Sequence, residues 1–182
     1  MTPRIPPLDP ADFTPEQAAL VGDWSHLVFS RVIVRHPELY AIFVPYIRQV
    51  IAESILPPRD REVLVLRVLA RAGDTYEMHH HEMIARGAGM TDAEIAAACS
   101  GEGLDEWDAA LVRAADELVR DSTMSDASWA ALSARLDQKQ MMEVVFLVGC
   151  YAVMAMLTKS FGMELEAAPE DFERIQSLRT YT

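Results

Sequence analysis

The stretch from Pro57 to Gly89, PPRDREVLVLRVLARAGDTYEMHHHEMIARGAG, decides the fold of this chain. The two prolines at its start end one helix, and the aspartate that follows opens the next, which we predict over residues 61–71. Apolar side chains fall on nearly all sides of that helix, which is typical of a buried helix. A glycine ends it, and a second helix then runs over about residues 74–88. The stretch therefore predicts a tight hairpin of two helices.

Similar start and stop signals divide the rest of the chain into helices. A hydroxyl or acidic cap followed three residues later by Glu or Gln, and proline in a first turn, both mark helix starts. No run of alternating β-branched residues bounded by turns occurs, so no strand is predicted and the fold class is all-α. Further helices are expected to start at Thr14-Pro15 and His36-Pro37, to span about residues 92–98, 106–120, 125–136 and 138–160, and to start again at Pro169.

Length and composition indicate one globular unit. The chain has 182 residues, of which 51% are hydrophobic and 24% charged, and this size buries enough surface for a core without disulfide or metal cross-links. Residues 1–13 contain four prolines and are expected to form an extended arm on the surface or on a neighbouring subunit. Residues 14–182 are predicted to form a single all-helical domain.

The charge of the chain excludes some partners. There are 28 acidic and 16 basic residues, a formal net charge of −12, and the basic residues form no run. Nucleic acid and anionic membranes are therefore not expected as partners, although a small anionic substrate is compatible with the local field of a site. No signal peptide is visible, and the uncharged stretch 144–157 is short for a membrane span, so a cytoplasmic location is expected.

One group of titratable side chains could support chemistry. Glu77 and His81 are four residues apart and share a helix face, and the hairpin can bring Glu62 to them. A carboxylate beside an imidazole suits acid–base catalysis near neutral pH. Purely structural roles compete with this interpretation: Asp74 can cap its helix, and an acid in the first turn, as at position 62, is favoured by the helix dipole.

The sequence does not favour metal or thiol chemistry. The three consecutive histidines diverge around a helix, and none is four residues from another. Glu77, His81 and Glu62 could still supply three ligands, which keeps a metal as a lesser alternative. Cys99 and Cys150 lie far apart in unlike surroundings and are interpreted as structural. No cofactor and no metal are expected.

Several motifs together resemble the carboxymuconolactone decarboxylase family, which includes the AhpD-like proteins. The resemblance begins near residue 37 and covers most of the chain from there. It implies an all-helical bundle that assembles into trimers or hexamers, often with the site near a subunit interface. The motifs are Leu56-Pro57-Pro58-Arg59-Asp60-Arg61-Glu62 with Val63 to Arg67, Tyr76-Glu77-x-x-x-His81, Ile84-Ala85-Arg86-x-Ala88-Gly89-Met90-Thr91-Asp92-Ala93-Glu94-Ile95, Ala114 to Leu118, Ser125 to Trp129 and Phe146 to Gly149.

The resemblance implies two possible chemistries. AhpD-like members carry a relay glutamate, a CxxC pair and a histidine, and here the glutamate falls on Glu62 and the histidine on His81. The two cysteine positions fall on Asp74 and Glu77. Because a thiol–disulfide cycle needs two thiols, peroxidase activity is disfavoured.

The decarboxylase branch resembles a Glu-x-x-x-His pattern, which Glu77 and His81 match. It implies a cofactor-independent lyase of aromatic catabolism that acts on a small carboxylated or lactone substrate. In this interpretation His81, oriented by Glu77, donates the proton and Glu62 tunes it. The residues expected to bind substrate or support the site are Asp74, Tyr76, His80 and Arg67, with Arg61 as an alternative to Arg67 for pairing the substrate carboxylate.

Other functions remain open on the same residues. The acid–base pair could serve an isomerase, a hydrolase or a dehydratase. Alternatively the chain could be a non-catalytic helical oligomer or binding module whose charged cluster is only a buried network. The expected partners are a small, anionic substrate and further copies of the chain.

Overall fold

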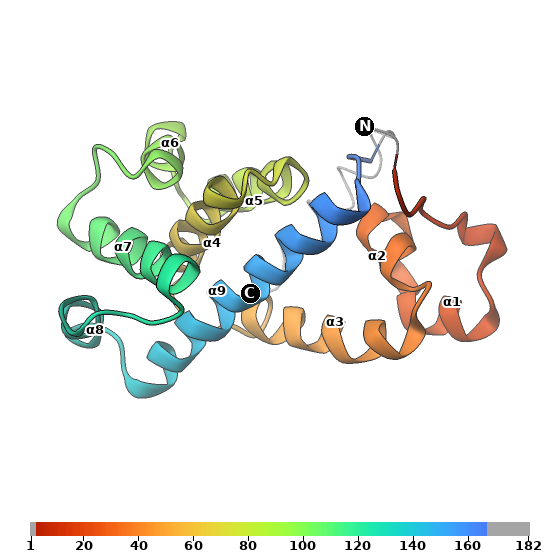
Figure 1. Cartoon of the computed structure of the whole chain (residues 1–182), viewed down its shortest axis with the longest axis horizontal. Helices are drawn as coiled ribbons and strands as arrows, with labels where there is room; N and C mark the ends of the chain where they lie inside the picture. The colour runs from red at the N-terminus through yellow and green to blue at the C-terminus, as the bar shows by residue number, and fades with distance from the viewer. Residues whose placement is uncertain (1–2, 167–182) are drawn as a thin grey trace.

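A computed structural model describes residues 3–166, and within them the fold is all-α, with no strand. The terminal helix expected from Pro169 lies outside the described residues. Figure 1 shows α9 running across the molecule, from α8 near one end to α2 near the other. The helices are α1 (Pro15–Val21), α2 (Val28–Ile33), α3 (Pro37–Ile51), α4 (Pro58–Ala72), α5 (Thr75–Gly87), α6 (Asp92–Ser100), α7 (Glu106–Asp121), α8 (Asp126–Ser133) and α9 (Gln138–Phe161), with 3-10 turns at Pro10–Asp12 and Gly22–His26.

Helix α4 is the centre of the core, as its sequence predicts. Every residue from Glu62 to Leu69 is buried, and the helix packs against α5, α6, α7 and α9. It begins at Pro58, earlier than the predicted residue 61, because proline fits the first helical turn, where its missing N–H is not needed. The element that carries Glu62 is thus surrounded by other helices.

The turn between α4 and α5 fixes how the hairpin closes. Gly73 adopts a left-handed conformation, with φ of +64°, and ends α4. The Asp74 carboxylate then accepts hydrogen bonds from the backbone N–H groups of Tyr76 (2.9 Å) and Glu77 (3.2 Å). The predicted cap is therefore confirmed, and α5 starts with its first turn already satisfied.

The N-terminal region contains a break that the sequence does not mark. The capping box of Thr14 and Gln17 starts α1 as predicted. At Gly22, with φ of +52°, the chain leaves the helix and makes a 3-10 turn before α2. The arm ahead of α1 lies along the same chain, where the N–H of Arg4 donates to the carbonyl of Phe161 (2.8 Å).

The last helices follow the predicted order with one change in length. Helix α8 ends at Ser133, whereas the pattern predicted 136, because the chain turns there before the Asp137 cap of α9. Helix α9 has 24 residues and is long and apolar enough to cross a membrane by length and composition alone. Half of its most apolar window is buried inside the protein, which the core helix of a soluble protein also shows.

One face of α9 carries exposed apolar side chains, whose spacing follows the helical repeat. They are Met142, Val145, Phe146, Val153 and Met156, which are 40–65% exposed. Surfaces of this kind commonly contact another protein chain, and assembly of this chain with further copies stays a prediction.

If copies meet through α9, the double variant Met142→Glu, Met156→Glu should shift the particle mass from a multiple of 20.3 kDa to that of one chain. Two charges in a closely packed apolar contact would be desolvated without partners. Light scattering coupled to size exclusion measures this mass. Val119→Glu, on the exposed surface of α7, is the matched control and should keep the mass of the parent. An unchanged mass in the double variant would argue against this face.

Candidate active site

A cavity of about 760 Å³ lies beside α5. That helix lines it at three- to four-residue spacing, and α1, α2, α3, α9 and the start of α4 supply the other walls. Among the lining residues within 3–166, Glu77 is the only carboxylate. The residues that α5 contributes are Tyr76, Glu77, His80, His81, Ile84 and Gly87.

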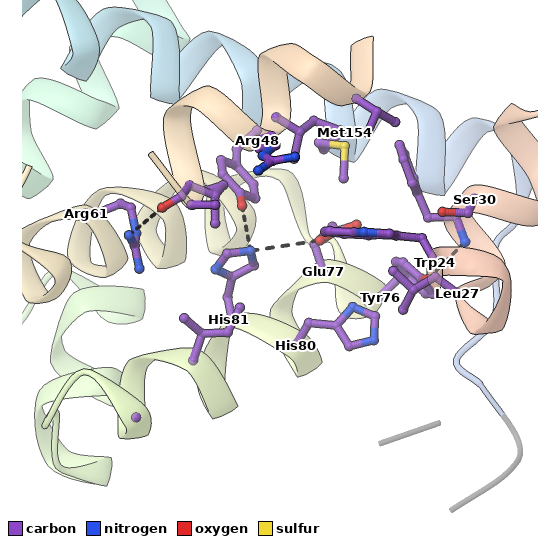
Figure 2. Close-up of a pocket in the computed structure, with 18 of the residues that line it drawn as sticks. Trp24, Leu27, Ser30, Arg48, Arg61, Tyr76, Glu77, His80, His81 and Met154 are labelled. Carbon is purple, nitrogen blue, oxygen red and sulfur yellow. Dashed lines mark hydrogen bonds and ion pairs between the residues drawn. The ribbon is translucent and has the colours of Figure 1, made fainter. Parts of the chain in front are cut away.

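His81 is held on both sides of its ring. Its Nδ1 lies 2.7 Å from Oε2 of Glu62, and its Nε2 lies 2.7 Å from the hydroxyl of Tyr151 (Figure 2 draws this second bond). A carboxylate only accepts, so Nδ1 of His81 carries a proton and donates it to Glu62. Glu62 and Tyr151 together therefore fix the orientation of the His81 ring.

Glu62 stands behind His81 and is completely buried. Its Oε1 accepts a hydrogen bond from Nε of Arg61 at 2.9 Å. Burial acts to raise the pKa of Glu62, but the charges and hydrogen bonds of His81 and Arg61 outweigh it, so the pKa lies below the usual range. Glu62 is thus an ionised supporting group that does not itself line the cavity.

Glu77 is the available acid of the site. Its Oε2 lies 4.0 Å from Nε2 of His81, and within residues 3–166 its carboxyl group accepts no hydrogen bond. The helix start is satisfied by Asp74, so the carboxyl is not used by the backbone of α5. Burial raises its pKa to about 7, although His80 and His81 act in the opposite direction. A carboxyl with this pKa is well placed to give or take a proton at neutral pH.

The raised pKa of Glu77 should make the protein less stable as the pH rises. The folded protein holds this proton to about pH 7, whereas an ordinary Glu releases it near 4.5. Between these values the folded state binds more protons than the unfolded state, so stability falls with rising pH and remains lower above pH 7. We expect Glu77→Gln to be more stable than the parent by on the order of 3 kcal/mol at pH 8, and by less than about 1 kcal/mol at pH 5.

Urea unfolding of both proteins at the two pH values measures this difference. Glu82→Gln, on a more exposed part of the same helix, should show no such pH dependence. A constant difference between parent and Glu77→Gln would show that Glu77 has an ordinary pKa.

A second network holds Tyr76 and His80 from behind. Oε1 of Glu166 accepts from the Tyr76 hydroxyl (2.6 Å) and from the N–H of Val28 (2.8 Å), and its Oε2 lies 3.1 Å from Nε2 of His80. Burial opposes ionisation of Glu166, but these hydrogen bonds lower its pKa to about 2. For His80, burial is outweighed by the Glu166 hydrogen bond and by nearby acids, so its pKa is raised. Both side chains line the cavity in fixed positions.

Two residues that the sequence suggested for substrate binding or for support of the site, Arg67 and Asp74, do not line the cavity. Arg67 forms a two-point ion pair with Asp116 (2.8 and 2.7 Å) and also donates to the carbonyl of Cys99, so its guanidinium is occupied away from the cavity. Asp74 caps α5 and accepts from the hydroxyl of Thr158 at 2.7 Å. Arg67 is thus not placed to bind a ligand in the cavity, whereas Asp74 supports the start of the helix that carries Tyr76 and Glu77.

Arg61 takes the place expected for Arg67. It lines the cavity and donates to Glu62 and to the carbonyl of Ile51. These bonds use Nε and Nη1, and Nη2 has no hydrogen-bond partner in the part of the chain that the structure describes. Of the three adjacent histidines, His80 and His81 line the cavity and His79 does not.

Neither cysteine lines the cavity. Burial, followed by the nearby Glu77 charge, raises the pKa of the Cys150 thiol to about 12, and burial also raises that of Cys99. Thiols of this kind are poor nucleophiles. Across residues 3–166 no group of three or more His, Cys, Asp or Glu side chains is arranged to hold a metal ion.

The model of the carboxymuconolactone decarboxylase family matches residues 37–120, the segment from α3 to α7 that carries Glu62, Glu77 and His81. This segment is therefore similar to the carboxymuconolactone decarboxylase family. No curated protein matches it.

Solved structures show that the likeness to AhpD-like proteins extends beyond the matched segment. A peroxidase-related protein with an alkylhydroperoxidase AhpD core, from Ralstonia eutropha JMP134, aligns with a TM-score of 0.78 at 13% identity, over 94% of this chain and 95% of that one. A protein of unknown function from Agrobacterium tumefaciens, described as an AhpD of antioxidant defence, aligns with a TM-score of 0.67 at 16% identity, over 75% of this chain and 96% of that one. At these identities the likeness establishes a shared fold.

Part of the site lies outside the segment that matches the family. Tyr151 comes from α9 and Glu166 from the segment after it, and the cavity wall formed by α1 and α2 precedes residue 37. Sequence reasoning missed both residues. The one signal for Tyr151 is a phenol within an otherwise apolar helix, where a buried hydroxyl needs a partner; for Glu166 the sequence offers none.

Proposed function

We propose that this protein is a cofactor-independent cytoplasmic enzyme that transfers protons on a small carboxylated or lactone substrate, with decarboxylation as its reaction. The observation that carries the proposal is the state of Glu77. Its carboxyl group faces the cavity without a hydrogen bond from residues 3–166, has a pKa of about 7, and lies beside an imidazole whose orientation is fixed. Supporting this, residues 37–120 match the model of a family named for a decarboxylase.

In the proposed reaction the carbon–carbon bond to the substrate carboxylate breaks and carbon dioxide leaves. The electron pair of that bond passes into the conjugated carbonyl system of the substrate. Protonated Glu77 then donates its proton to the substrate carbon, and water returns a proton to Glu77. A weakly polar cavity favours the loss of a carboxylate charge. The atoms and electrons of this reaction balance without an oxidant, a reductant or a metal.

The geometry supports roles for the acid and the imidazole that are the reverse of those that the sequence favoured. Both nitrogens of His81 are engaged, by Glu62 and by Tyr151, whereas the Glu77 carboxyl is available. We therefore assign Glu77 as the proton donor, and His81 as the neighbour that stabilises its ionised form. Arg61 is proposed to pair with the substrate carboxylate through its remaining N–H groups.

A second candidate, an isomerase, is favoured by one observation. Two histidine–carboxylate pairs, His81 with Glu62 and His80 with Glu166, flank Glu77. Removal of a proton at one carbon and its return at another uses two such groups. Thiol peroxidase activity, which the descriptions of the structural neighbours suggest, is not proposed, because no thiol lines the cavity.

The direct test is turnover of a carboxymuconolactone, followed by ultraviolet absorbance and by release of carbon dioxide. We expect turnover by the parent that declines above pH 7, as Glu77 loses its proton. The double variant Cys99→Ser, Cys150→Ser should keep this activity. Absorbance change without carbon dioxide would favour the isomerase. No change of either kind at high enzyme concentration would remove this substrate and favour a binding module.

A further inference from the structure

The cavity has two chemically different ends. Figure 2 places His81 and Arg61 on one side of Glu77, and Trp24, Leu27 and Ser30 on the other. The first end carries the titratable groups and a guanidinium. The second end carries the apolar side chains of Trp24 and Leu27, and further apolar side chains that line the cavity are Leu20, Phe29, Val44 and Ile47. A ligand that fills the cavity must therefore be polar at one end and apolar at the other.

Hydrogen bonds hold the wall of the apolar end in place. It is formed largely by α1, the 3-10 turn after Gly22 and α2, which precede the family match. The N–H of Val28 donates to Glu166 (2.8 Å), and that of Phe29 donates to the hydroxyl of Tyr76 (3.1 Å). The same buried network that positions His80 thus fixes this wall beside the acid.

The volume exceeds what a single-ring lactone needs. At about 760 Å³ the cavity lies within the roughly 300–1,000 Å³ of sites that enclose drug-sized ligands. A one-ring acid held at Glu77 would leave the wall of Trp24 and Leu27 in contact with water. Each additional methylene buried there would strengthen binding about fourfold.

We propose that the substrate is an amphiphile. Its carboxylate or lactone head lies against Glu77, His81 and Arg61, and an apolar chain or ring of several carbons lies along Trp24 and Leu27. The identity of the head group rests on the proposed function. The apolar part is carried by the wall that α1 and α2 form.

Straight-chain fatty acids from butanoate to dodecanoate test this with the full chain. Calorimetry at pH 6, where Glu77 is largely protonated, should show a dissociation constant that falls about fourfold per methylene until the cavity is filled. Longer acids should also change the fluorescence of Trp24, and Trp24→Phe should remove that change. A dissociation constant independent of chain length would overturn the proposal.

A cavity-filling variant separates this site from non-specific binding. Leu27→Trp should weaken dodecanoate binding at least tenfold and leave butanoate within about twofold, since Leu27 lies on the side of the cavity away from His81 and Arg61 and only the longer chain reaches it. Val119→Trp, on the exposed surface of α7, should change neither value. Equal affinities of parent and Leu27→Trp for dodecanoate would contradict the proposal.

These measurements also distinguish the inference from the proposed function. Chain-length-dependent binding without turnover of any lactone would retain the amphiphile and remove the lyase. Turnover of carboxymuconolactone that dodecanoate does not inhibit, together with binding that ignores chain length, would retain the lyase and remove the amphiphile.

Discussion

Glu77→Gln is expected to lower kcat about 10²–10⁴-fold, the usual contribution of a positioned general acid. The amide has nearly the same shape as the protonated carboxyl group and fills the same space, but it cannot release a proton to the substrate. Since the Glu77 carboxyl makes no hydrogen bond with the described part of the chain, the substitution leaves no partner unsatisfied. The loss should appear in kcat, whereas KM should change little, because the proton is delivered in the transition state.

Two controls connect this loss to the chemistry. Glu82→Gln, one turn further along α5, changes a side chain that is 39% exposed and paired with Arg86, and should keep full activity. Urea unfolding should show that Glu77→Gln is folded and more stable than the parent at pH 8, which excludes misfolding as the cause. If Glu77→Gln retained activity within tenfold of the parent, the proton donor would have to be sought elsewhere, and His81 would be the first candidate.

The parts of this structure that could be predicted are those set by local chemistry. Gly73 and Asp74 act within a few residues of their own position, by allowing a left-handed turn and by capping the next N–H groups. The pairing of Glu77 with His81 follows from four-residue spacing on one helix. The burial of α4 could also be predicted locally, because apolar side chains fall on nearly all sides of this helix.

The remaining features depend on how separate helices meet. The Tyr151 hydroxyl reaches His81 across 70 residues, and Glu166 reaches His80 across 86. Neither contact can be predicted from the spacing of residues along one helix. The prediction for Arg67 failed for this reason: its sequence position suits a pocket, but the adjacent α7 presents Asp116 to it. Likewise, only tertiary contacts show that His81 is oriented by Glu62 rather than by Glu77.

Glu62→Ala should have the largest effect on folding, a loss of about 3–5 kcal/mol in the free energy of unfolding, as when one partner of a buried charged pair is removed. The side chain is fully buried, and its two oxygens accept from Arg61 and from His81. Removing it leaves a guanidinium that is 13% exposed without its counter-charge and an imidazole N–H without an acceptor. Glu62→Gln keeps one acceptor oxygen and should cost less.

Urea unfolding at pH 7 measures this effect, with Glu82→Ala as the matched control. That substitution removes a partly exposed i, i+4 ion pair and should cost less than about 1 kcal/mol. Because the pKa of Glu62 is lowered on folding, its contribution is present above the pKa of an unfolded Glu and is lost as the pH falls through the folded value. The deficit of Glu62→Ala should therefore shrink in acid. A deficit below 1 kcal/mol at pH 7 would mean that Glu62 neither balances Arg61 nor holds His81, and the imidazole beside Glu77 would lose the support on which its proposed role depends.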